Sequence, residues 1–284
     1  MSDQKNVLQG DLLSSSNDEF DMVDISSIEE AIGTFDNNVP NTYQDINILI
    51  NEKEGETTPE SLKTENEAIK NILNDDSLIK RPSWGPTKTN GLKFTDAYKL
   101  ILKSETNLNS IRFLNPDGGR NNLNNYNREE FLAAIGVNKD NFKKIKEQSK
   151  GYITVLVGNN SHDHAVTLLI NLNNAENFED LKNNNKKCYY RIDTKRFAEK
   201  TSFRDDDENS RPKNLLKNRI LPTQGFNECT LQSAAFIVGF SEALKNNNNV
   251  EIILNNTKKI KNIIKEGRKI FESKNLLENK GVCK

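Results

Sequence analysis

The chain has 284 residues, with a hydrophobic fraction of 34%, a charged fraction of 29% and a net charge of −1. So polar a composition indicates that part of the chain lies outside any folded core. The net charge alone does not argue for or against nucleic acid, and we expect no nucleic-acid partner. No apolar run reaches the length of a transmembrane helix, and the N-terminus lacks the pattern of a secretory signal, so we expect a soluble protein.

The chain has three widely separated cysteines, Cys188, Cys229 and Cys283. An odd number at irregular spacing is not typical of a disulfide framework and favours a reducing compartment.

Residues 1–80 are predicted to form a disordered acidic tail, because they lack a sustained apolar face. Within residues 1–50, Lys5 is the only base against ten acidic residues. The tail contains Phe20 and Val23 in acidic surroundings, which resembles the short motifs that add a strand to autophagy ubiquitin-like modifiers. Two apolar anchors could fill pockets there while the main chain pairs with a sheet edge. Such four-residue patterns also occur by chance.

Residues 81–284 are predicted to form the folded domain. Its first elements are short helices at Phe94–Leu102 and Arg128–Ile135, the second capped near Asn127. Three strands follow, because their residues are β-branched, aliphatic or aromatic over strand length. These strands are Tyr152–Val157 and Ala165–Leu172, which form an antiparallel hairpin, and Cys188–Ile192, which ends at Asp193. Two polar excursions, Asn173–Lys187 and Thr194–Asn218, are predicted to lie outside the core.

A polar turn then leads into a helix at Cys229 that is apolar on most of its surface up to Leu244. Such a helix is predicted to be buried. Cys229 would lie in its first turn, where the helix dipole stabilises a thiolate. A buried core cysteine without chemistry is the alternative. The last helix, Val250–Leu276, is basic and amphipathic; we expect it to pack its apolar side on the domain, with membrane-surface or polyanion binding as the alternative.

The only two histidines, His162 and His164, lie where a turn enters the second strand. A nucleophilic thiolate needs a base, a group that orients the base, and donors to the oxyanion. His164, Asp193 and Gln224 supply this set for Cys229, and His164 is preferred to His162 because it adjoins the apolar strand. Since there is no third histidine and Asp163 would face the opposite side from the two histidines, we expect no metal.

This order of residues resembles the CE clan of cysteine proteases, which includes SUMO and ubiquitin-like proteases, adenovirus-type proteases and bacterial effector deubiquitinases. The resemblance covers about residues 150–245 and rests on the segments His164–Ile170, Tyr190–Asp193 and Gln224–Cys229. It implies an α+β, papain-like or adenain-like fold with a central, mostly antiparallel sheet and the nucleophile at a helix N-terminus. His164 would be the base, Asp193 its orienting acid, Cys229 the nucleophile and Gln224 the oxyanion donor.

The chain departs from the family pattern at three positions. Ala165 stands where the family usually has tryptophan, and Thr230 stands where it usually has glycine. Gln224 is five rather than six residues before Cys229, so Asn227 or backbone N–H groups are alternative oxyanion donors.

The resemblance further implies a thiol protease without a cofactor that cleaves after the C-terminal glycine of ubiquitin or a ubiquitin-like modifier. It also implies a bacterial effector that leaves the bacterial cytoplasm and acts in the host-cell cytoplasm. If Phe20 and Val23 form a binding motif, the substrate is an autophagy modifier. The alternatives are a YopJ-type serine, threonine or lysine acetyltransferase, which would use acetyl-CoA and inositol polyphosphate, and an inactive modifier-binding module.

Overall fold

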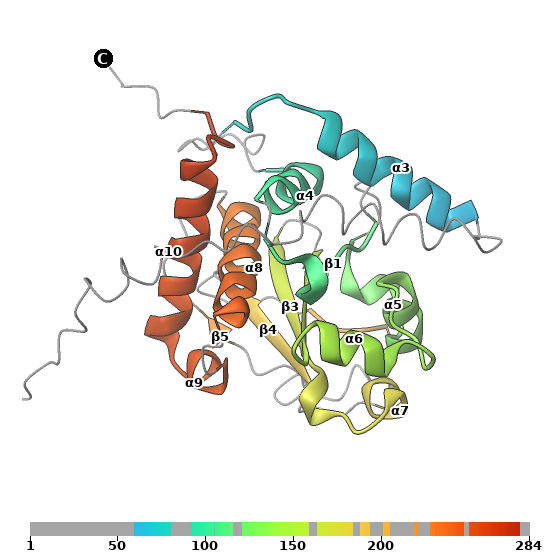
Figure 1. The fold of residues 1–284 in the computed structure, drawn as a ribbon. Coiled ribbons are helices and arrows are strands. Elements are labelled where there is room, and N and C mark those ends of the chain that lie inside the picture. The colour runs from blue at the N-terminus through green and yellow to red at the C-terminus, as the bar shows by residue number, and fades with distance from the viewer. Residues whose placement is uncertain are drawn as a thin grey trace, which may run out of the picture. The chain divides into compact units, whose positions relative to one another are not determined.

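A mixed β-sheet lies between two groups of helices in the computed structural model of the chain, which is therefore α+β (Figure 1). The structure describes residues 60–80, 92–104, 106–115, 121–158, 164–183, 188–193, 201–204, 219–220, 228–246 and 250–278. The strands follow one another across the sheet in chain order. They are β1 (Ile111–Arg112), β2 (Tyr152–Gly158), β3 (Ala165–Asn171), β4 (Tyr189–Asp193) and β5 (Arg219–Ile220).

The three central strands are antiparallel, whereas the two short outer strands run parallel to their neighbours. The predicted hairpin is confirmed, and its register runs from Gly158 opposite Ala165 to Tyr152 opposite Asn171. All residues of β2 and β3 are buried. A sheet covered on both faces explains why these strands are continuously apolar instead of alternating.

The helices in the described ranges include the predicted ones at Phe94, Arg128 and Cys229. Asn127 caps the second of these, since its side chain accepts a hydrogen bond from the backbone N–H of Glu130. The helices are α3 (Glu60–Asn74), α4 (Phe94–Lys103), α5 (Arg128–Ala134), α6 (Phe142–Gln148), α7 (Phe178–Lys182), α8 (Cys229–Lys245), α9 (Val250–Leu254) and α10 (Thr257–Ser273).

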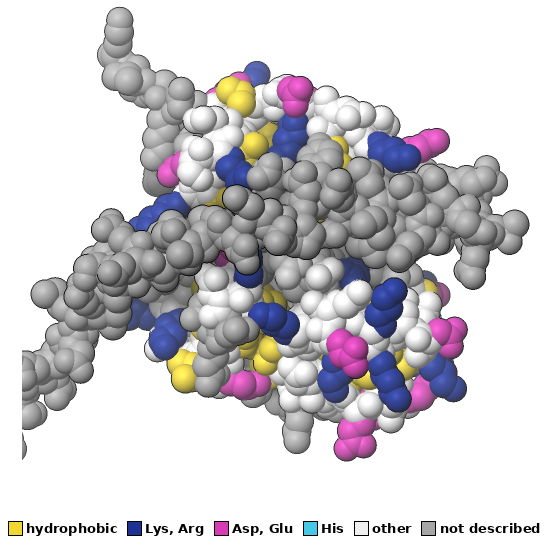
Figure 2. All heavy atoms as spheres, in the orientation of Figure 1, with side chains coloured by type: hydrophobic (Ala, Val, Ile, Leu, Met, Phe, Trp, Pro, Cys, Tyr) yellow, Lys and Arg dark blue, Asp and Glu magenta, His cyan; other side chains and the backbone are white. Residues whose placement is uncertain are grey.

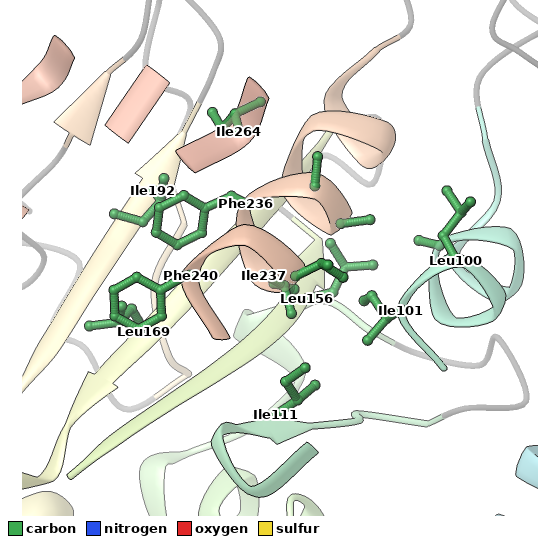
Figure 3. Packing of buried hydrophobic residues seen from close by; sticks show 14 of the residues in the cluster. Leu100, Ile101, Ile111, Leu156, Leu169, Ile192, Phe236, Ile237, Phe240 and Ile264 are labelled. Atoms are coloured by element: carbon green, nitrogen blue, oxygen red, sulfur yellow. The ribbon is translucent and has the colours of Figure 1, made fainter. Parts of the chain in front are cut away.

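Each face of the sheet has its own hydrophobic core. On one face, α8 packs against the strands through Phe236, Ile237 and Phe240, with α4 and α10 beside it (Figure 3). On the other face, α5, α6 and α7 cover a second core that includes Phe131 and Phe142. Fourteen of the 17 residues of α8 are buried, which confirms the prediction of a core helix.

Helices α8 and α10 run side by side in close contact (Figure 1). Two glycines make this approach possible. A Cβ at Gly239 would collide with the carbonyl oxygen of Ile263, and a Cβ at Gly267 would collide with the carbonyl oxygen of Ala235. The helix that carries Cys229 is therefore fixed against the C-terminal helix by direct backbone packing.

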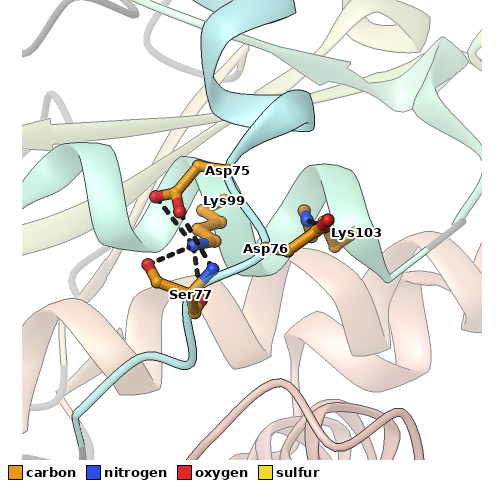
Figure 4. Close-up of polar contacts among 5 residues, drawn as sticks. All are labelled: Asp75, Asp76, Ser77, Lys99 and Lys103. Carbon is orange, nitrogen blue, oxygen red and sulfur yellow. Dashed lines mark hydrogen bonds and ion pairs between the residues drawn. The ribbon is translucent and has the colours of Figure 1, made fainter.

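The prediction that the tail extends to residue 80 is wrong for its last part. Residues 60–74 form α3, and Ile79 is buried and pairs with Leu277 in an isolated β-bridge. Residues 75–78, between α3 and Ile79, are bound to α4 by ion pairs and hydrogen bonds. Lys99 forms an ion pair with Asp75 at 2.8 Å and donates to Ser77, and Lys103 pairs with Asp76 at 2.7 Å (Figure 4). The composition of this segment gives no sign of these contacts, because the partner residues Lys99, Lys103 and Leu277 lie elsewhere in the sequence.

Two other expectations need correction. The basic C-terminal segment is not one helix, because the side chain of Asn256 accepts hydrogen bonds from the first turn of α10 and so begins a new helix after α9. The expected apolar side is nevertheless buried, at Ile253, Ile260, Ile264 and Phe271. Both polar excursions contain buried residues: Ala175 and Leu181 of the first belong to the second core, and Thr201–Phe203 of the second are buried, with Phe203 packed edge-on against Phe131.

Basic and acidic side chains are interspersed on the face of the molecule shown in Figure 2. Within the described ranges, no helix has both the length and the apolar character needed to cross a membrane.

The close crossing of α8 and α10 predicts that Gly267→Ala destabilises the fold. Alanine is the better helix former by about 1 kcal/mol, but the collision with Ala235 should outweigh this gain. We expect a net loss of about 1–3 kcal/mol in the free energy of unfolding, measured by urea denaturation. Asn262→Ala, an exposed substitution on α10, is the control and should not destabilise the protein. Unchanged stability of the Gly267 variant would contradict the packing described.

Candidate active site

Cys229 is the first residue of α8 and is only partly buried. One turn further along, α8 is tied to β3 by two hydrogen bonds. The hydroxyl of Ser233 donates to the carbonyl of Ala165 at 3.4 Å, and the hydroxyl of Thr167 donates to the carbonyl of Ser233 at 3.3 Å. These bonds fix the N-terminus of α8 at the end of the sheet where β3 begins.

His164 immediately precedes β3, and Asp193 is the last residue of β4. Because Thr167 pairs with Ile192 in the antiparallel register, the start of β3 and the end of β4 lie at the same end of the sheet. There His164 Nε2 lies 2.7 Å from Asp193 Oδ1, with only 2% and 0% of the two side chains exposed. A buried carboxylate at this distance fixes both the orientation of the imidazole and the position of its proton.

His164 also forms a hydrogen bond with the thiol of Cys229. Since Nε2 is occupied by Asp193, the ring nitrogen left for the sulfur is Nδ1. Burial disfavours the charged imidazole, but the hydrogen bonds to Asp193 and Cys229 outweigh it and raise the pKa of His164 to about 9. Burial likewise raises the pKa of the Cys229 thiol, but hydrogen bonds from His164 and the Ala165 backbone N–H reverse this and lower the pKa.

The hydroxyl of Thr230 adds a weaker contact to this sulfur, at 3.9 Å. Its hydrogen bond also lowers the pKa of Cys229, so Thr230 adds a donor to the thiolate.

The second cysteine of the described ranges shows what burial does without such partners. Cys188 is buried in the core beneath the other face of the sheet, and desolvation raises the pKa of its thiol to about 11. The two cysteines therefore differ in reactivity because of their neighbours, and Cys229 alone of the two is suited to react as a thiolate.

Glu228, the residue before Cys229, is bound by a side chain of α10. Glu228 does not cap its own helix with its side chain; instead its carboxylate accepts hydrogen bonds from Arg268 at 3.1 Å and from Gln232 at 3.0 Å. The carboxylate next to Cys229 is thus neutralised by a cation, which limits its repulsion of a thiolate.

The structure brings together three of the predicted site residues, His164, Asp193 and Cys229. Gln224 and its alternative Asn227 lie outside the described residues, as do His162 and the tail residues Phe20 and Val23.

Two arginines that contact the site were not predicted from the sequence: Arg191, which binds Asp193, and Arg268, which binds Glu228. Arg191 has a signal in the sequence, because it is an arginine inside an otherwise apolar strand, two residues before Asp193. Arg268 has none, since it belongs to a helix rich in lysine and its partner Glu228 is 40 residues away.

Among the described residues there is no group of three or more histidine, cysteine or acidic side chains placed to hold a metal ion. Comparisons of the chain with protein-family models, curated proteins and solved structures find no match.

The contacts of Cys229 predict selective alkylation by iodoacetamide. The thiolate–imidazolium pair exists above the lowered pKa of Cys229 and below the raised pKa of His164, about 9. At pH 7 Cys229 should therefore react at least about tenfold faster than Cys188, as followed peptide by peptide with mass spectrometry. His164→Gln removes the imidazolium cation while the thiol of Cys229 stays partly buried, so Cys229 should react at least about tenfold more slowly than in the wild type. Equal rates at Cys188 and Cys229, or no effect of His164→Gln, would contradict the assignment.

Proposed function

We propose that this chain is a cysteine-type protease that cleaves after the C-terminal glycine of ubiquitin or a ubiquitin-like modifier. The observation that carries the proposal is the partly exposed thiol of Cys229 in contact with His164, which Asp193 holds at 2.7 Å. A nucleophile, a base in contact with it and a group that orients the base form the arrangement that acyl transfer by a thiol requires.

In the first step, the Cys229 thiolate attacks the carbonyl carbon of the C-terminal glycine. The C–N bond to the substrate's lysine or peptide breaks, and the imidazolium of His164 gives its proton to the leaving amine. Asp193 remains ionised and keeps the imidazole in place throughout. The product of this step is a thioester between the glycine and Cys229.

In the second step, neutral His164 takes a proton from water, which attacks the thioester and releases the modifier with a free carboxylate. The sulfur leaves as a thiolate and pairs again with the protonated imidazole. Both steps pass through an oxyanion. The first backbone N–H groups of α8, which begins at Cys229, lack acceptors within the helix, and such groups can stabilise an oxyanion. We propose that these N–H groups and the side chain of Gln224 together donate hydrogen bonds to the oxyanion.

The substrate class rests on the resemblance of the order His164, Asp193, Gln224 and Cys229 to the CE clan. The α+β architecture agrees with a papain-like fold, and we propose that finer assignment on the same resemblance. The proposals that the protein is a bacterial effector in a host cell, and that Phe20 and Val23 direct it to an autophagy modifier, have the same basis.

The same triad would also serve an acetyltransferase of the YopJ type, for which the basic residues of α10 would have to bind an inositol polyphosphate. Arg268 is engaged with Glu228, so an inositol polyphosphate would have to bind the exposed lysines of α10, such as Lys258 and Lys259.

The test is labelling with a panel of ubiquitin and ubiquitin-like proteins that carry a thiol-reactive group at the C-terminus. We expect a covalent adduct with at least one modifier, detected as a mass shift. Cys229→Ala should abolish the adduct, and His164→Gln should reduce its rate of formation at pH 7 about tenfold or more.

Cys188→Ala is the matched control, because it removes a buried thiol far from the proposed chemistry and should keep the adduct. Absence of an adduct with every modifier, in protein whose Cys229 still reacts with iodoacetamide, would overturn the substrate assignment. Transfer of a radiolabelled acetyl group from acetyl-CoA to a protein side chain would then support the acetyltransferase.

A further inference from the structure

The carboxylate of Asp193 is shared between two cationic side chains. Its Oδ1 lies 2.7 Å from His164 Nε2, and its Oδ2 accepts a hydrogen bond from Arg191 Nη2. Arg191 is two residues before Asp193 on β4, so both side chains leave the strand on the same face. The side chain of Arg191 is only 4% exposed and that of Asp193 is fully buried.

A buried arginine in the middle of a strand needs an explanation, because the neighbouring strand positions are filled by apolar residues. Removing a charge from water costs several kcal/mol unless a partner compensates for it. Asp193 is such a partner, but its carboxylate already has a cationic partner in His164. One carboxylate beside two cationic side chains is explained if the site requires two positive charges when it is active.

The charge balance of the site supports this explanation. With the thiolate–imidazolium pair formed, Cys229 and Asp193 are negative while His164 and Arg191 are positive, so these four side chains together carry no net charge. Without Arg191 the other three would carry one net negative charge, which a site of low dielectric constant disfavours. The other charged pair at this end of α8, Glu228 with Arg268 of α10, is balanced within itself.

We propose that Arg191 is a positioning residue of the thiol site, which holds Asp193 against His164 and supplies the positive charge that makes the active ion pair neutral. This inference deepens the proposed function and rests on Cys229 being the nucleophile. Arg191 does not touch the sulfur and acts through Asp193 and His164.

The proposal fixes the sign of a pH effect. Loss of a positive charge near the site disfavours the thiolate, so the pKa of Cys229 should rise. The imidazolium then no longer shares Asp193 with Arg191, so the pKa of His164 should rise as well. Both limits of the pH range in which the ion pair exists should therefore move to higher pH, whereas a loss of stability alone would move neither.

The experiment measures the rate of Cys229 alkylation by iodoacetamide against pH in the full chain, with each cysteine peptide quantified by mass spectrometry. For Arg191→Met we expect the midpoint of the acid limb to rise by about one pH unit, which is a tenfold slower reaction at a pH below both midpoints. Arg191→Lys keeps the charge and should keep the midpoint near that of the wild type.

Arg128→Met is the matched control. Arg128 is as buried as Arg191, but it lies over the ring of Phe203 at 5.0 Å and belongs to α5. This variant should lose stability without moving the acid limb. An unchanged midpoint in Arg191→Met, or an equal shift in Arg128→Met, would overturn the proposal.

Arg191→Met removes one of the two cations beside a buried carboxylate and therefore costs stability. Asp193→Asn and the double variant Arg191→Met/Asp193→Asn measure the same effect without a buried carboxylate. The double variant should show a higher acid-limb midpoint than Asp193→Asn alone, and equal midpoints would refute the role of Arg191. The modifier probes are scored separately. An adduct with an unshifted midpoint refutes only the role of Arg191, and a shifted midpoint without an adduct refutes only the protease.

Discussion

Helix α8 is buried between the sheet and α10, and this packing sets where the thiol lies. Fourteen of its 17 residues are buried, and its glycine contacts with α10 leave no space for a side chain at the crossing. A helix held on two sides in this way cannot slide or rotate without opening the core. Its first residue, Cys229, is therefore set at a fixed point beside the end of the sheet, although that residue itself remains partly exposed.

The thiol site follows from this placement and from the sheet register. Antiparallel pairing of β3 with β4 brings His164 and Asp193 to the same end of the sheet, and the Ser233 and Thr167 hydrogen bonds bring α8 to them. Burial acts to raise the pKa of both thiols, Cys188 and Cys229. Only the partners of Cys229 reverse that effect, so the electrostatic neighbourhood rather than the residue type separates an inert cysteine from a reactive one.

The charges around the site are arranged in compensated pairs. Glu228, which adjoins the nucleophile, is neutralised by Arg268 from α10, and Asp193 is shared between His164 and Arg191. A site that forms a thiolate and an imidazolium in a largely buried place must keep its total charge near zero. This requirement accounts for two arginines that have no place in a simple three-residue description of the site.

The sequence by itself determined the elements whose signals are local. The strands at Tyr152 and Ala165, the cap at Asn127 and the core helix at Cys229 were all predicted, because composition, spacing and capping residues act within a few positions. It also singled out His164, Asp193 and Cys229 as candidates. Only the tertiary structure decided that these three touch, that Arg191 and Arg268 join them, that residues 60–80 are anchored through Lys99, and that a helix ends before Asn256. The contacts of His164 with Asp193 and Cys229, of Arg268 with Glu228 and of Lys99 with Asp75 join residues tens of positions apart, so packing and register set them and no local pattern contains them. The Asn256 cap and the Arg191–Asp193 contact lie within three residues, but only the folded chain shows that they are made.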